Sequence, residues 1–146
     1  MNQPPRSNSM LMAARPSAVG EARAYARWVL GRWQLSEMAD TVELLVSELV
    51  TNAMRATGTV CEPADERLLA GKVKPVYLSL YILTETVLIE VWDASAVPPL
   101  RRVASADEET GRGLMLVQTL SKEWGWDVLE TGGKVVWCKC LIAEAI

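Results

Sequence analysis

Residues 37–56 read EMADTVELLVSELVTNAMRA, and this stretch does most to decide the fold. Ser36 precedes it as a capping residue and Gly58 follows it as a stop signal. Its apolar residues recur at steps of three and four, the spacing of one face of an α-helix, at Met38, Val42, Leu45, Leu49 and Ala53. The sequence therefore predicts a long amphipathic helix over residues 37–56.

The segments on either side supply further helices and paired strands. Residues 18–30 are rich in alanine and arginine and predict a helix that Ser17 caps and Gly31 ends. A third helix is expected to open at residues 111–113 and to continue through residues 114–120. The β-rich segments form pairs around short polar turns, as hairpins do: residues 76–83 with 87–92 around 84–86, and residues 126–130 with 135–140 around 131–133.

Strands that pair as hairpins, with helices outside them, are typical of the α+β class. We therefore expect a two-layer α/β sandwich, with helices on one face of a mostly antiparallel sheet. The length of 146 residues suits one domain. Residues 1–16 contain three prolines and are expected to be a flexible N-terminal arm, with a short strand around residues 10–14. Residues 17–146 are expected to form the domain.

Composition excludes several classes of function. The net charge is −3, which argues against nucleic acid as a partner because phosphate backbones need a basic surface. The longest stretch without a charge is the ten residues 75–84, whereas a membrane span needs about 20. The three cysteines show no framework spacing and indicate a reducing, cytoplasmic setting.

Histidine is absent from the chain. Its absence excludes serine–histidine and cysteine–histidine nucleophilic pairs, an imidazole base and histidine metal ligands. Cys138 and Cys140 are spaced as a metal clip could be, but two strand residues without further ligands are better interpreted as thiols of a strand.

Glu48 and Asn52 lie four residues apart and therefore share one side of the predicted helix. A solvated polar face is one interpretation. Asparagine, however, is a poor residue deep inside a helix because its amide competes for the backbone. A carboxylate and an amide oxygen one turn apart can also hold Mg²⁺ and its waters, with the carboxylate serving as a base.

Two further features are weak signals when each is taken alone. Asp93 ends a hydrophobic strand, where it either begins a turn or accepts a hydrogen bond from a purine amino group. Gly111-Arg112-Gly113 opens a predicted helix, where free amides bind phosphate, but it lacks the third glycine of a dinucleotide fingerprint.

In combination and in this order, the segments Glu48-Leu-Val-Thr-Asn52, Asp93-Ala-Ser95 and Thr110-Gly-Arg-Gly113-Leu114 resemble the N, G1 and G2 boxes of the GHKL (Bergerat-fold) ATPases. The tail, with Gly125 and residues 133–137, is similar to the stand-alone regulators of that superfamily that are related to anti-sigma factor serine/threonine kinases. The resemblance covers nearly the whole chain.

The resemblance implies ATP and Mg²⁺ as cofactors. It makes Glu48 the base or water-orienting carboxylate, Asn52 the Mg²⁺ ligand and Asp93 the acceptor for the adenine amino group. The segment between residues 94 and 110 becomes the ATP lid. The phosphate-facing helix start falls on Gly111, Arg112, Gly113 and Leu114.

The resemblance also implies a regulatory role in transcription through protein partners. These are a sigma factor, an anti-anti-sigma-like protein that is phosphorylated on serine or threonine, and a second copy of the chain. Arg23 is the nearest match to an arginine that touches the protein substrate in such kinases. Ser95 and Val97 stand where the G1 box has glycines, so a non-catalytic, nucleotide-gated interaction module is the alternative.

Overall fold

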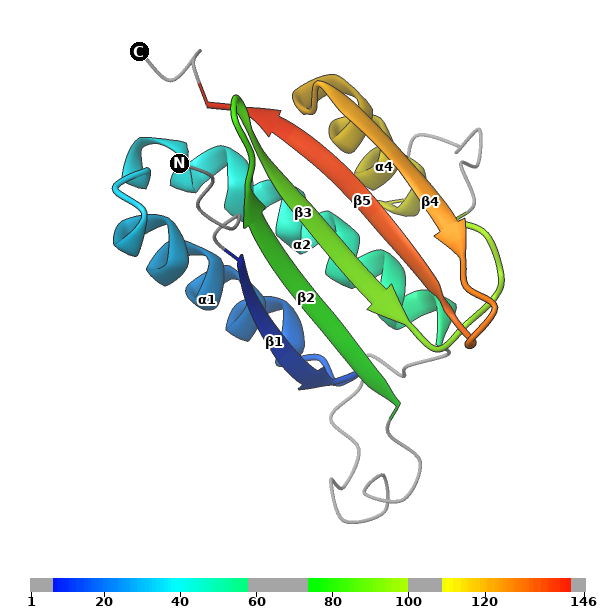
Figure 1. Ribbon diagram of the computed structural model, residues 1–146. Helices are drawn as coiled ribbons and strands as arrows, with labels where there is room; N and C mark the ends of the chain where they lie inside the picture. The colour runs from blue at the N-terminus through cyan, green and yellow to red at the C-terminus, as the bar shows by residue number, and fades with distance from the viewer. Residues whose placement is uncertain (1–6, 58–73, 100–108, 143–146) are drawn as a thin grey trace.

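The computed structural model describes residues 7–57, 74–99 and 109–142 of the chain (Figure 1). Five strands form one sheet in the order β1-β2-β3-β5-β4, and every neighbouring pair is antiparallel. The strands are β1 (Ser7–Ala13), β2 (Pro75–Ile82), β3 (Thr86–Asp93), β4 (Glu123–Val128) and β5 (Lys134–Leu141).

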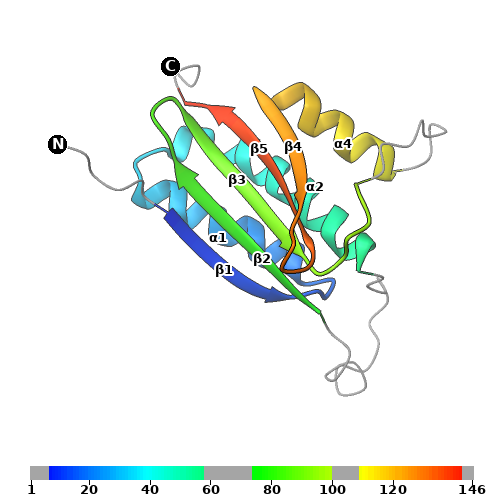
Figure 2. The ribbon, with the colours of Figure 1, turned by 45° about the vertical axis from the view of Figure 1, so that its right-hand side comes forward.

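The helices of the described residues cover one face of this sheet (Figures 1 and 2). They are α1 (Ala18–Arg32), α2 (Ala39–Ala56), which follows the short 3₁₀ helix η1 (Ser36–Met38), and α4 (Glu109–Leu120). The expected α+β fold with helices on one face of an antiparallel sheet is confirmed. None of these helices, within the part of the chain that the structure describes, is long and apolar enough to cross a membrane.

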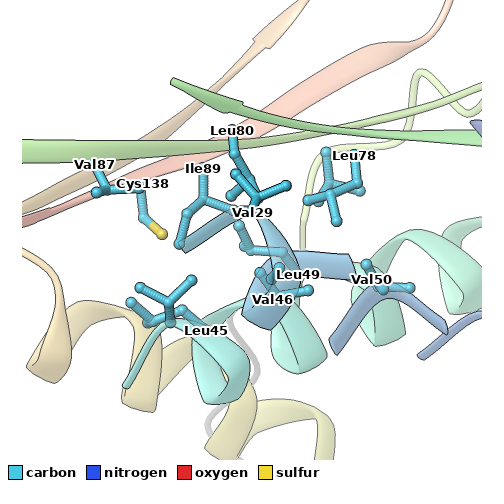
Figure 3. Packing of buried hydrophobic residues seen from close by; sticks show 14 of the residues in the cluster. Val29, Leu45, Val46, Leu49, Val50, Leu78, Leu80, Val87, Ile89 and Cys138 are labelled. Carbon is cyan, nitrogen blue, oxygen red and sulfur yellow. The ribbon is translucent and has the colours of Figure 1, made fainter. Parts of the chain in front are cut away.

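The core lies between α2 and the sheet, and the predicted helical stripe forms its helical side. Val42, Leu45, Val46, Leu49 and Val50 are fully buried on α2. Figure 3 shows the side chains of this stripe pointing toward those of the strands, which alternate between the two faces of the sheet. The facing strand residues include Leu78, Leu80, Val87, Ile89 and Cys138.

The short strand expected around residues 10–14 is present as the edge strand β1, but it begins earlier and runs over Ser7–Ala13, so these residues are not a flexible arm. This strand pairs with β2, so the sheet begins before residue 17. Met12 is buried against the core and Leu11 is exposed on the other face. The apolar run of residues 10–12 hides this alternation in the sequence, because the outward residue is apolar as well.

Several element boundaries also differ from those expected. The first helix continues through Gly31 to Arg32, and Ser17 makes no side-chain capping hydrogen bond. The second helix is 3₁₀ over its first turn and becomes α-helical at Ala39. The strand expected at residues 126–130 is displaced toward the N-terminus, to Glu123–Val128, where it pairs with β5 through Lys139 to Lys134. The loop expected at residues 59–74 lies almost wholly outside the described residues.

Both cysteines of β5 are free thiols in the interior, as expected for thiols of a strand. Burial raises the pKa of the Cys138 thiol well above its usual range, with a smaller contribution from Cys140. In the described part of the chain, no group of three or more histidine, cysteine, aspartate or glutamate side chains could hold a metal ion.

Candidate functional site

The C-terminal half of α2, the end of β3 and the start of α4 lie toward the same end of the molecule (Figures 1 and 2). At the other end of the molecule, a pocket is lined by the start of α2 and the last residues of α4. The two helices therefore run in opposite directions. These elements therefore bring together the segments that carry Asn52, Asp93 and Gly111.

Asn52 lies on α2 between the fully buried core residue Leu49 and the buried Ala53. Its side-chain oxygen Oδ1 is buried, and no hydrogen-bond partner lies within reach in the described structure. Glu48, one turn earlier, is half-buried on the same side of the helix. Asn52 and Glu48 are each half-buried, so this face of α2 is only partly solvated, and the side-chain oxygen of Asn52 is removed from water.

Asp93 is the last residue of β3 and its side chain is fully buried. Oδ1 accepts a hydrogen bond from the backbone N–H of Ser95 at 2.8 Å and another from Nζ of Lys134 at 2.9 Å. Oδ2 is 2.8 Å from the same Nζ. The ammonium group of Lys134 therefore contacts both carboxylate oxygens of Asp93 in the interior.

The bond from Ser95 shows that Asp93 does begin a turn, one of the two roles considered for it. Ser95 Oγ in turn accepts a hydrogen bond from the backbone N–H of Val97 at 3.1 Å. The two residues that replace the glycines of the G1 box therefore belong to a hydrogen-bonded turn. The turn uses Oδ1 of Asp93, whereas Oδ2 contacts the ammonium group of Lys134.

The sequence analysis did not select Lys134 as a site residue, because it follows Gly132 and Gly133 in a segment that was interpreted as a hairpin turn. It is fully buried and lies directly opposite Asp93 in the β3–β5 register. Residues of β5 alternate between the two faces, and Lys134 has the same parity as the buried Val136 and Cys138. That parity is the signal that could have placed its side chain in the interior.

The turn before β5 fixes this lysine against the end of β3. Gly133 has a φ of +77°, and a Cβ at this position would lie 2.2 Å from the backbone oxygen of Asp93 and 2.8 Å from the ring of Trp92. Trp92 Nε1 also donates a hydrogen bond to the carbonyl of Gly132 at 3.2 Å. Only glycine permits this approach at residue 133.

Gly111, Arg112 and Gly113 lie inside α4, which begins at Glu109 rather than at these residues. The expected helix start is therefore two residues too late. The first four backbone N–H groups of a helix have no partner within it, so the amides of residues 109–112 remain available to an anion. Leu114, the next residue, is buried and holds this end of the helix on the core.

In the described part of the chain, two buried side-chain oxygens have no hydrogen-bond partner, Asn52 Oδ1 and Asp93 Oδ2. Asp93 Oδ2 is nevertheless stabilised by the ammonium group of Lys134, 2.8 Å away. Asn52 Oδ1 is therefore the unsatisfied acceptor of this region. Such an atom costs about 1–3 kcal/mol of stability, so its presence calls for an explanation, and a bound cation would supply one.

The oxygen atoms available as ligands at Asn52 are of a kind that binds Mg²⁺. Amide and carboxylate oxygens are ligands that Mg²⁺ takes, and the ion is commonly bound by one or two protein groups together with waters and substrate phosphates. Asn52 Oδ1 supplies an unused oxygen, Glu48 lies one turn away, and the start of α4 offers amides for phosphate.

The family model described as histidine kinase-like ATPase domain matches residues 12–139. The match begins in β1 and ends in β5, so it includes every element of the site. No protein with a curated function matches the chain significantly. The resemblance to the GHKL ATPases that the sequence motifs indicate is confirmed at the level of this family.

Proposed function

The chain belongs to the family of histidine kinase-like ATPase domains, an ATP-binding module of the GHKL type, and we propose that it binds ATP and Mg²⁺ through Asn52, Asp93 and the start of α4. The observation that carries this proposal is the unsatisfied buried oxygen Asn52 Oδ1, together with the fully buried carboxylate of Asp93 at the end of β3. They belong to the two residues that the N and G1 motifs select.

Each part of the ATP molecule meets a suitable group. The Asp93 carboxylate accepts a hydrogen bond from the adenine amino group, and the amides at the start of α4, those of Gly111 and Arg112 among them, receive the phosphates. Asn52 Oδ1, with waters and phosphate oxygens, holds Mg²⁺. When bound, the ion neutralises the charge that develops as the terminal phosphoryl group departs.

We further propose that the ATP serves phosphoryl transfer to a serine or threonine of a partner protein, in the manner of the anti-sigma factor kinases. Glu48, half-buried one turn before Asn52, orients or deprotonates the incoming hydroxyl. The partner is a sigma factor or its antagonist in the cytoplasm, and the protein acts as a homodimer. The chain has no histidine, so it holds no phosphoacceptor histidine of its own.

A specific observation favours a second function, that of a non-catalytic module whose partner binding depends on nucleotide. Ser95 and Val97 replace the glycines of the G1 box, and both take part in the turn that follows Asp93. A turn stabilised in this way has less freedom than a glycine segment. In this alternative the nucleotide binds and is not consumed.

One pair of variants distinguishes ATP binding from phosphoryl transfer. Glu48→Gln retains the shape of the side chain and removes its basic charge, and Glu21→Gln makes the same change at an exposed position on α1. The kinase proposal predicts that Glu48→Gln binds ATP·Mg²⁺ as tightly as the wild type in calorimetry. It also predicts that transfer of label from γ-³²P-ATP to lysate proteins falls about 10²–10⁴-fold.

The Glu21→Gln variant should match the wild type in both assays. Equal labelling by the wild type and by Glu48→Gln would overturn the catalytic role of Glu48. Tight ATP binding with no labelled protein would favour the non-catalytic module. If the wild type does not bind ATP·Mg²⁺, the proposed function is wrong.

A further inference from the structure

A pocket lies between the start of α2 and the end of α4, at the end of the molecule where β5 ends (Figure 1). Its volume is about 500 Å³, within the range of about 300–1,000 Å³ that small-molecule sites occupy. Asn52 lies near the C-terminal end of α2, about 20 Å along the helix from its first turn. The pocket is therefore separate from the proposed ATP site.

The innermost residues of the pocket are apolar. Met38 is 4% exposed and Cys140 is 6% exposed, and both line the pocket together with Leu120 and Leu141. Burial raises the pKa of the Cys140 thiol, so this side chain is uncharged at neutral pH and contributes an apolar surface. A ligand that fills the pocket therefore needs an apolar part.

Two opposite charges lie on different walls of the same pocket. Glu37 belongs to η1, directly before α2, and Lys122 follows the end of α4. Among the residues that the structure describes, neither side chain forms an ion pair. Opposite charges do meet between α1 and α2, where Arg27 binds Glu43. The charges of Glu37 and Lys122 are instead held apart across the pocket.

The hydroxyl groups on the α4 side add hydrogen-bond acceptors. Thr119 Oγ1 donates to the carbonyl of Met115 at 2.8 Å, and Ser121 Oγ donates to the carbonyl of Val117. Each hydroxyl group has one proton to donate and two lone pairs, so both are left as acceptors. A cationic N–H group in the pocket would find these oxygens as well as a carboxylate.

The ends of the helices account for part of this arrangement. An acidic residue stabilises the N-terminus of a helix and a basic residue stabilises the C-terminus, so Glu37 and Lys122 each suit their own helix. That role explains the sign of the two charges. It does not require the helices to stand apart over apolar residues such as Met38 and Cys140.

We propose that this pocket binds a small zwitterion, an α-amino acid with an apolar side chain. The carboxylate of Glu37 and the hydroxyl oxygens of Thr119 and Ser121 accept hydrogen bonds from the ammonium group of the ligand. Lys122 Nζ donates to its carboxylate, and its apolar side chain lies against Met38 and Cys140. An amine without a carboxylate would be repelled by Lys122, and an acid without an ammonium group would be repelled by Glu37.

The first test varies the ligand on the wild-type protein. Calorimetry measures the binding of L-leucine, of 3-methylbutylamine, which lacks the carboxylate, and of 4-methylpentanoate, which lacks the ammonium group. L-Leucine should bind, and each analogue should bind about 10-fold more weakly or worse, because it loses a charge-assisted hydrogen bond. Glycine, a zwitterion without an apolar side chain, should also bind more weakly than L-leucine.

The second test assigns the two charges of the ligand to the protein. Glu37→Gln should weaken L-leucine about 10-fold and leave 4-methylpentanoate at least as tightly bound as by the wild type. Lys122→Gln should weaken L-leucine to a similar degree and leave 3-methylbutylamine at least as tightly bound. Both positions are exposed, so the variants should fold. Glu21→Gln and Lys74→Gln, at exposed positions outside the pocket, are the matched controls.

The proposal is wrong if the wild type does not bind L-leucine up to the solubility limit of the amino acid. It is also wrong if either single-charge analogue binds as tightly as L-leucine, since one charge would then suffice. If Glu37→Gln and Lys122→Gln bind L-leucine as the two control variants do, the amino acid lies elsewhere on the protein. Binding of ATP·Mg²⁺ is measured separately, so none of these results decides the proposed function.

Discussion

Replacing Asn52 with leucine should make the protein more stable and at the same time impair its binding of ATP·Mg²⁺. Leucine has the same number and branching of heavy atoms as asparagine, and it removes the buried acceptor Oδ1 that has no partner. A residue that served only the fold would show the opposite result, a loss of stability on substitution.

The magnitude follows from three contributions. Removing an unsatisfied buried acceptor recovers about 1–3 kcal/mol. Leucine also has a better helix propensity than asparagine, by a few tenths of a kcal/mol. Fitting the branched side chain beside Leu49 and Ala53, which are buried neighbours on α2, costs up to about 1.5 kcal/mol. The net expectation is a gain of about 1 kcal/mol, which raises Tm by roughly 2–4 °C in a domain of this size.

Urea denaturation without nucleotide measures the stability, and calorimetry with and without Mg²⁺ measures the binding. The Asn52→Leu protein should bind ATP with little dependence on Mg²⁺, whereas the wild type should bind more tightly with the ion. Thr41→Leu is the control, a half-buried position at the other end of α2. If Asn52→Leu is less stable than the wild type by more than about 1 kcal/mol, its amide is a satisfied structural group and the reasoning is wrong.

Three other predictions concern the buried groups. Asp93→Asn and Lys134→Met should each lower the free energy of unfolding by about 3–5 kcal/mol, because each leaves a buried charge or polar group unpaired. The double variant should lose much less. Additive losses of the two single variants in urea denaturation would contradict a buried pair. Burial raises the pKa of Cys138, so iodoacetamide at pH 8 should modify this thiol only in unfolded protein. Peptide mapping measures the modification. Rapid labelling of the native protein would show that the thiol is accessible. Burial raises the pKa of Glu90 above 4.5, opposed by a hydrogen bond from Tyr81. The folded state therefore favours the protonated form of Glu90. Protonation stabilises the fold fully below pH 4.5. This stabilisation is lost as the pH rises through the pKa of Glu90 in the folded protein. Glu90→Gln should be more stable than the wild type at neutral pH by up to about 0.5 kcal/mol, and thermal melts should show the difference vanishing toward pH 4; a difference that does not change with pH would exclude this cause.

Much of the fold could be predicted because it depends on periodic burial. The stripe on α2 and the alternation in β2 and β3 follow directly from which side chains leave water. Strand β1 was harder because its outward residue Leu11 is apolar and exposed. Strand β4 was placed too late because Trp126 and Val128, which carry the β pattern, lie in its exposed half near the turn.

The candidate site divides in the same way. Asn52 was suggested by its residue type, since asparagine is unexpected inside a helix, whereas Asp93 was selected by its place in the combination of motifs. Lys134 was missed because a lysine after two glycines is ordinary in an exposed turn. Its parity with Val136 and Cys138 and the pairing of β3 with β5 place its side chain in the interior, opposite Asp93.

The placement of these polar groups says what the site requires of the fold. Around Leu45 and Ile89, in the middle of the α2–sheet interface, the interior is apolar and gains stability from burial alone. The unsatisfied Asn52 Oδ1 lies on α2, and the buried ion pair lies at the end of β3 and the start of β5. A fold under selection for stability alone would have apolar residues there too, because such replacements are neutral or stabilising. The polar groups persist at a cost in stability, and a ligand that satisfies them recovers that cost as binding free energy.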